Sequence, residues 1–89
     1  MARIRVPSVL RPLAGGSPSL ESPAGTVGDL QSDLSARFPD LAARLYGADG
    51  ELQEYVNLFI DGEDARELGP EAPLAQNSEV VLLPAISGG

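Results

Sequence analysis

The sequence predicts a small α+β domain, in which a mixed sheet of four to five strands packs against one main helix. Three observations favour this class. Residues 2–9 and 52–60 alternate between apolar and polar side chains, which is the period of half-buried strands. Residues 27–38 instead place apolar side chains at the spacing of one helix face. Residues 80–83 are all valine or leucine, which indicates a strand near the C-terminus.

Composition limits what this domain can do. Its 89 residues form one small domain, whose core is near the lower limit for independent folding. The net charge of −7 argues against nucleic acid and anionic membranes as partners, and favours a basic enzyme surface. There is no cysteine or histidine, and all six basic residues are arginine, so the thiol nucleophile, the lysine amine and the commonest general base and metal ligand are missing. We therefore expect a protein that is not an enzyme and that binds no metal or cofactor itself.

The chain is expected to contain one domain, residues 1–84, followed by a flexible tail, residues 85–89, that ends in two glycines. The N-terminus lacks the apolar core of a signal peptide, and no apolar run approaches the length of a membrane span. We expect a cytoplasmic protein that is monomeric on its own.

Residues 2–9 predict the first strand, with Ile4 and Val6 on its inner face. Prolines and glycines in residues 12–18 predict a flexible hairpin loop, which returns the chain as a second, weaker strand over residues 19–22. The two adjacent glycines of this loop are not followed by the helix that a phosphate-binding loop requires, so a plain hairpin loop is favoured.

A helix is predicted to begin after Thr26, because Thr26 and Asp29 have the spacing of a capping box. Its apolar face consists of Val27, Leu30, Leu34 and Phe38. Pro39 disfavours helical geometry at the residue before it and ends this helix. Residues 40–46 predict a short second helical turn.

The strongest internal strand signal covers residues 52–60. Asp61-Gly62 then has the composition of a tight turn, and residues 63–68 predict a short edge strand. The acidic residues of this turn lack the length and spacing of a calcium-binding loop, so a solvated turn is favoured over a cation site. Residues 69–77 predict a loop.

Residues 80–83 predict the last strand, which Pro84 ends because proline has no N–H to donate to the ladder. Strand alternation, counted back from the C-terminus, places Val80 and Leu82 toward the helix. The order of elements is then strand, strand, helix, short helix, strand, short strand, strand. If the first and last strands are parallel neighbours, this is the β-grasp architecture.

The same alternation places Val81 and Leu83 on the open face of the sheet, together with Phe59. An exposed apolar patch of this kind usually marks a site for a partner, so we interpret these three residues as a docking surface. The alternative is that they complete the core.

These features resemble a known family. The order of elements, residues 56–61 (Val-Asn-Leu-Phe-Ile-Asp) and residues 83–89 (Leu-Pro-Ala-Ile-Ser-Gly-Gly) are similar to the ubiquitin-like sulfur carriers of bacteria, the MoaD/ThiS family. The loop of residues 10–16 and the segment 84–89 most resemble the carriers of cysteine biosynthesis in actinobacteria. The molybdopterin synthase small subunit and the thiamine-pathway carrier belong to the same family.

The resemblance implies that Gly89 is the reacting residue. A terminal carboxylate, with a pKa of about 3.5, is an anion at neutral pH and a poor electrophile, so it needs a leaving group. In the family, an enzyme of the ubiquitin-activating type uses ATP and Mg to adenylate it, and sulfide or persulfide then displaces AMP to leave a thiocarboxylate. Ile86, Ser87 and Gly88 are expected to thread with Gly89 into that enzyme, where glycine permits close approach of the backbone.

The acceptor of the sulfur stays open at this point. In the cysteine branch, a pyridoxal phosphate-dependent cysteine synthase would take sulfur from Gly89, and a zinc peptidase would release the cysteine formed there. In the molybdopterin branch, the large subunit of molybdopterin synthase would be the partner. Thiosugar and thiamine pathways, and a ubiquitin-like modifier that is joined to lysines of other proteins, are further alternatives.

Overall fold

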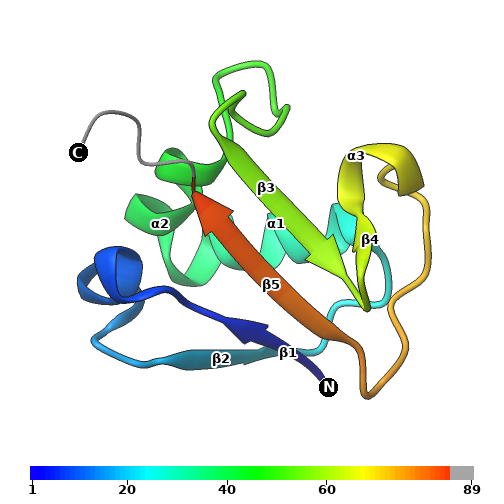
Figure 1. Ribbon diagram of the computed structural model, residues 1–89, viewed down its shortest axis with the longest axis horizontal. Helices are drawn as coiled ribbons and strands as arrows, with labels where there is room; N and C mark the ends of the chain where they lie inside the picture. The colour runs from blue at the N-terminus through cyan, green and yellow to red at the C-terminus, as the bar shows by residue number, and fades with distance from the viewer. Residues whose placement is uncertain (85–89) are drawn as a thin grey trace.

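The computed structural model describes residues 1–84, which form a five-stranded mixed sheet in the order β2-β1-β5-β3-β4 (Figure 1). The strands are β1 (Ala2–Arg5), β2 (Ser19–Ser22), β3 (Val56–Ile60), β4 (Glu63–Asp64) and β5 (Glu79–Pro84). β1 and β5 are parallel neighbours in the centre, and the other pairs are antiparallel. The predicted α+β class and the parallel first and last strands of the β-grasp are confirmed.

Helices cover one face of this sheet. They are the 3-10 helix η1 (Ser8–Ala14) and the α-helices α1 (Val27–Arg37), α2 (Pro39–Leu45) and α3 (Ala65–Leu68). The predicted cap of α1 is confirmed, because the Thr26 hydroxyl accepts a hydrogen bond from the Asp29 N–H at 3.1 Å. Pro39 occupies the first turn of α2, where its missing N–H costs nothing, so two short helices follow each other directly.

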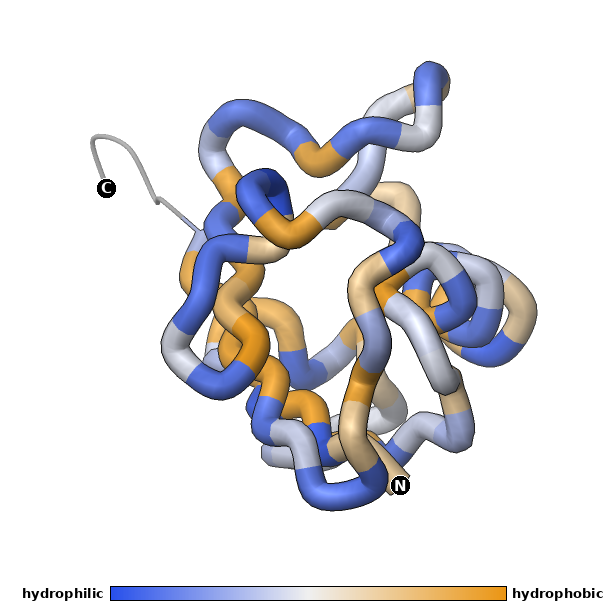
Figure 2. The backbone as a smooth tube through the Cα atoms, turned by 90° about the vertical axis from the view of Figure 1, so that its right-hand side faces the viewer, coloured by the Kyte–Doolittle hydropathy of each residue, from blue (hydrophilic) through white to orange (hydrophobic). Residues whose placement is uncertain are grey.

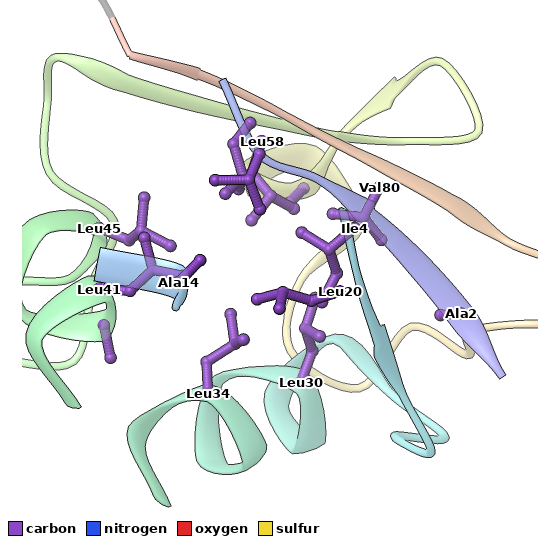
Figure 3. Packing of buried hydrophobic residues seen from close by; sticks show 14 of the residues in the cluster. Ala2, Ile4, Ala14, Leu20, Leu30, Leu34, Leu41, Leu45, Leu58 and Val80 are labelled. Atoms are coloured by element: carbon purple, nitrogen blue, oxygen red, sulfur yellow. The ribbon is translucent and has the colours of Figure 1, made fainter. Parts of the chain in front are cut away.

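The core lies between the sheet and α1. Figure 3 shows Leu30 and Leu34 pointing from α1 toward Ile4, Leu58 and Val80 on the strands. All five side chains are fully buried or nearly so. Burial of a side chain of this size contributes about 1.5–3 kcal/mol to folding, so this layer supplies much of the stability of a small domain. Leu41 and Leu45 of α2 and Ala14 of η1 extend the core at one side.

The predicted first strand and hairpin loop are partly wrong. β1 ends at Arg5, and residues 8–14 form η1 instead of a loop. Leu10 and Ala14 lie four residues apart and are both buried, so the segment gains more from packing as a helix than as a flexible loop. Gly15, with φ 69°, ends η1 in the left-handed conformation that glycine adopts at low cost.

Two predicted strands are shorter in the structure. β3 begins only at Val56, because Leu52 instead forms an isolated bridge with Tyr46 and the chain turns immediately before the strand. The predicted edge strand over residues 63–68 divides into β4 and α3, because the Asp64 carboxylate accepts a hydrogen bond from the Arg66 N–H and starts a helical turn.

Within the described residues the last strand ends at Pro84, as predicted, and Pro84 itself is still paired, opposite Val56 on β3. The Asp61 N–H donates to the Glu79 carbonyl, so hydrogen-bonded pairs alternate from there along β3 and β5. That alternation makes the Val56 and Pro84 pair a non-hydrogen-bonded one, in which Pro84 needs no N–H toward β3. Pairing with β1 already stops at Val81, so no donor is needed on that side either.

Apolar and polar residues alternate in short steps along much of the chain (Figure 2).

Within residues 1–84, no helix has the length and apolar character needed to cross a membrane.

Candidate functional site

The predicted reacting segment lies outside the described residues. Ile86, Ser87, Gly88 and Gly89 all follow Pro84, so their roles stay predictions. The structure does describe the strand that leads to them. β5 is the central strand of the sheet, with β1 on one side up to Val81 and β3 on the other side up to Pro84.

The two faces of β5 differ as predicted. Val80 and Leu82 are 0% and 1% exposed and belong to the core. On the opposite face Val81 is half-buried, and Leu83 is 49% exposed. The half-buried Phe59 lies directly across from Val81 in the antiparallel pair of β3 and β5. Phe59, Val81 and Leu83 therefore share the face of the sheet that the helices leave open, and we call them the apolar patch.

The alternative that these three residues complete the core does not hold for Leu83, since half of its side chain is in solvent. Asn57, which is opposite Leu83, is only half-buried as well. The helices lie on the other side of the sheet (Figure 1). The geometry thus provides an apolar surface at the end of β5, while its role in docking stays a proposal.

An arginine-lined groove adjoins the apolar patch. Arg5 of β1 lies beside Val81 in the parallel pair, and Arg11 of η1 donates from Nε to the Val6 carbonyl at 3.2 Å. The groove contains Arg3, Arg5 and Arg11 together with Val81 and Leu83, and we call it the arginine groove. Sequence reasoning placed Arg11 in a flexible loop and so missed this grouping. The alternation of Arg3 and Arg5 with Ile4 in β1 indicated two of the three arginines of this groove.

The groups with shifted pKa values lie elsewhere and have structural roles. A hydrogen bond from the Glu79 N–H, followed by one from the Ser78 hydroxyl, lowers the pKa of Asp61 below its usual value. A hydrogen bond from Arg37 lowers the pKa of Asp33, and the buried Ser22 hydroxyl adds a second bond at 2.7 Å. Neither carboxylate belongs to the apolar patch.

Tyr46 is the third such group. Burial raises the pKa of its phenol to about 12, so it stays protonated at physiological pH. It lies after α2, on the helical side of the molecule. It is thus unsuited to proton transfer near the end of β5.

Two of the three acidic residues in the turn after β3 have structural roles. Asp61 bonds Ser78 and Glu79, and Asp64 caps α3, so two of its carboxylates are engaged with the chain itself. Among residues 1–84, no group of three or more potential ligands is placed to hold a metal ion. The turn Asp61-Gly62 has positive φ at both residues, 51° and 88°, which is the tight hairpin that its composition predicts.

The sequence match decides the family. The model of the ThiS family matches residues 4–89, nearly the whole chain. The chain belongs to the ThiS family. This confirms the resemblance to ubiquitin-like sulfur carriers, and with it the expectation that the protein is a carrier and not an enzyme.

Relatives of the same length support this membership. The sulfur carrier protein CysO of Mycobacterium tuberculosis is 35% identical over 89 residues, covering 97% of this chain and 96% of its own. The crystal structure of that organism's CysO matches with a TM-score of 0.84 at 32% identity, over 97% of this chain and 100% of the other.

Two further relatives bear on partners and function. The crystal structure of the Amycolatopsis orientalis BexX/CysO complex matches with a TM-score of 0.87 at 30% identity and covers 100% of both chains. Small archaeal modifier protein 1 of Haloferax volcanii is 41% identical over 64 residues, or 72% of this chain and 70% of its own. This ThiS-family chain is therefore similar both to proteins named as sulfur carriers and to a protein named as a modifier.

Proposed function

We propose that this protein is a sulfur carrier whose Gly89 carboxylate is converted into a thiocarboxylate. The observation that carries the proposal is the family match, which runs through residue 89 and so includes the two terminal glycines. The chain has no cysteine, histidine or lysine, so a modified end group is the one route by which it could hold transferable sulfur.

The proposed chemistry has two steps. An activating enzyme joins the Gly89 carboxylate to the α-phosphate of Mg-bound ATP, which releases pyrophosphate and leaves an acyl adenylate. Sulfide then attacks the carbonyl carbon, the C–S bond forms, and the bond to the AMP oxygen breaks. A persulfide can replace sulfide if a thiol afterwards cleaves its S–S bond. The carrier contributes no acid or base to either step.

The apolar patch is the proposed contact with the activating enzyme. Phe59, Val81 and Leu83 lie on the strand that leads to the tail and on its hydrogen-bonded neighbour β3. A partner that covers these side chains would hold the chain close to its reacting end. The complex of the Amycolatopsis orientalis relative with BexX supports the idea that such carriers meet a protein partner.

Cysteine biosynthesis is the proposed destination of the sulfur. The similarity to CysO over nearly the full chain supports it. The thiocarboxylate would react on a pyridoxal phosphate-dependent cysteine synthase, and a zinc peptidase would release the product from Gly89. Molybdopterin synthase, thiosugar and thiamine pathways are alternative acceptors of the same thiocarboxylate.

Protein modification is a second candidate function. The 41% identity to small archaeal modifier protein 1 favours it, because an acyl adenylate can also react with the amine of a lysine on another protein. Sulfur transfer and modification share the activation step and differ only in the nucleophile that follows.

The deciding experiment incubates the purified protein with the activating enzyme of the same organism, ATP, Mg and sulfide. Intact-protein mass spectrometry should show one oxygen replaced by one sulfur. Without ATP the mass should stay unchanged. A protein that keeps its mass when all components are present contradicts the proposal, and conjugates on lysines in cell extracts would favour the second candidate.

A further inference from the structure

We propose that the arginine groove binds an acidic segment of the activating enzyme and speeds its docking to the apolar patch. This inference rests on the proposed function and adds the charge of the partner surface. It differs from what net charge alone suggests, because a chain of charge −7 favours a basic partner.

The charge distribution around the sheet carries the argument. Arg3 and Arg5 project from the open face of β1, and η1 brings Arg11 to the same groove. Their acidic neighbours are two glutamates, Glu21 opposite Arg3 on β2 and Glu79 beside it on β5. Half of the six arginines line the groove and none of its lining residues is acidic, so the groove is locally positive on an acidic molecule.

These three arginines make few interactions within the fold. Arg5 forms an ion pair with Glu79, but its side chain remains 65% exposed, so the pair is screened and contributes little to stability. Arg11 donates one hydrogen bond through Nε, and all three arginines are exposed to solvent. Exposed guanidinium groups suit planar carboxylates, which they bind through two parallel hydrogen bonds.

The position of the groove identifies the occupant. Val81 and Leu83 belong to both the arginine groove and the apolar patch, so a partner on the patch must also face the arginines. A surface that places Asp or Glu side chains beside apolar ones would match both parts. Charges at the rim of an interface mainly raise the association rate, whereas buried apolar contacts slow dissociation.

The first arm of the test measures association of the full-length protein with the activating enzyme by stopped flow. Arg3→Gln and Arg11→Gln should each slow association roughly two- to fivefold at about 0.1 M salt. Arg44→Gln is the matched control, because Arg44 is exposed on α2 and its loss changes the net charge equally. At about 1 M salt, where the screening length falls to about 3 Å, the differences should largely disappear.

The second arm of the test removes a negative charge, so the expected change in the association rate has the opposite sign. Glu79→Gln removes the partner of Arg5 and should speed association, with Glu71→Gln in the exposed loop before β5 as its control. Thermal unfolding of each variant verifies that the fold is kept. Opposite signs for Arg3→Gln and Glu79→Gln, each exceeding its control, support the inference.

Three outcomes overturn the inference. If the arginine variants associate faster and Glu79→Gln slower, the partner surface is basic, as net charge suggests. If the arginine variants associate at the same rate as Arg44→Gln, the groove is not part of the interface. If the arginine variants raise the KM for ATP without changing the association rate, the arginines contribute to binding of the nucleotide. When the wild-type protein is neither bound nor thiocarboxylated, the proposed function itself fails, which distinguishes the two failures.

Discussion

The Ser78 hydroxyl donates a hydrogen bond to the Asp61 carboxylate at 2.9 Å, and this joins the β3–β4 turn to the start of β5. The second Asp61 oxygen accepts from the Glu79 N–H, also at 2.9 Å. Ser78 is buried, and its oxygen in turn accepts from the Ala75 N–H. One carboxylate therefore fixes the point where the loop before β5 enters the sheet.

We expect Asp61→Asn to lower the free energy of unfolding by about 1 kcal/mol at pH 7, because the amide keeps only one of the two acceptor oxygens. Asparagine tolerates the positive φ of 51° at this position, so the loss reports hydrogen bonding rather than backbone strain. Urea unfolding of both proteins measures the difference.

Comparison of the wild type with Asp61→Asn also tests how the stability depends on pH. The pKa of Asp61 is lowered in the folded state, so its contribution is present above the unfolded value of 3.8 and is lost as the pH falls through the folded pKa. The stability difference between wild type and Asp61→Asn should therefore shrink below about pH 3.8. A difference that stays constant down to pH 2 would show that the ionised carboxylate is not the stabilising group.

The apolar patch can be tested by Leu83→Asp. The side chain is 49% exposed, so the change should cost little stability but should weaken binding to the activating enzyme roughly tenfold or more, because an apolar contact becomes a buried charge. Titration calorimetry measures the binding, and circular dichroism follows thermal unfolding. Ala43→Asp, on the exposed side of α2, adds the same charge away from the patch. Unchanged affinity for Leu83→Asp would remove the patch from the interface.

Sequence patterns correctly predicted those parts of the fold that depend on interactions between residues close in the sequence. Thr26 and Asp29 set the start of α1 through one hydrogen bond between neighbours, and the alternation along 80–83 separated core from surface. The misplaced segments depend on distant partners. Residues 8–14 form η1 because Leu10 and Ala14 pack into the core, and Pro12 together with the glycines that follow the segment obscured that spacing.

The candidate site shows the same division. Strand alternation alone placed Phe59, Val81 and Leu83 together, and the register of β3 and β5 confirms it. Arg11 joins this face only because η1 exists, so the arginine groove could not be predicted once that segment was interpreted as a loop. The net charge of the whole chain did not indicate the groove either, because it sums the charges of all faces and does not report the charge of any one surface.

The end group can be tested by adding one alanine after Gly89. The added residue moves the carboxylate one position further along the chain, and its methyl group places a Cβ where glycine permits close approach, so adenylation should be abolished. ATP–pyrophosphate exchange by the activating enzyme measures this step. The melting temperature should stay that of the wild type, because the addition follows the described domain. Normal exchange with the extended protein would show that Gly89 does not carry the reacting carboxylate.

The destination of the sulfur can be tested with the thiocarboxylated protein itself. A pyridoxal phosphate-dependent cysteine synthase converts an activated serine into a bound aminoacrylate, whose β-carbon accepts a sulfur nucleophile. The Gly89 thiocarboxylate should add there through sulfur, and transfer of the acyl group to the amine would then leave cysteine joined to Gly89 by an amide bond. Intact-protein mass spectrometry should show this adduct, whereas protein with an ordinary Gly89 carboxylate should remain unchanged because oxygen is the weaker nucleophile. If the thiocarboxylate survives with the synthase but is consumed by the large subunit of molybdopterin synthase and its pterin precursor, the carrier serves that pathway instead.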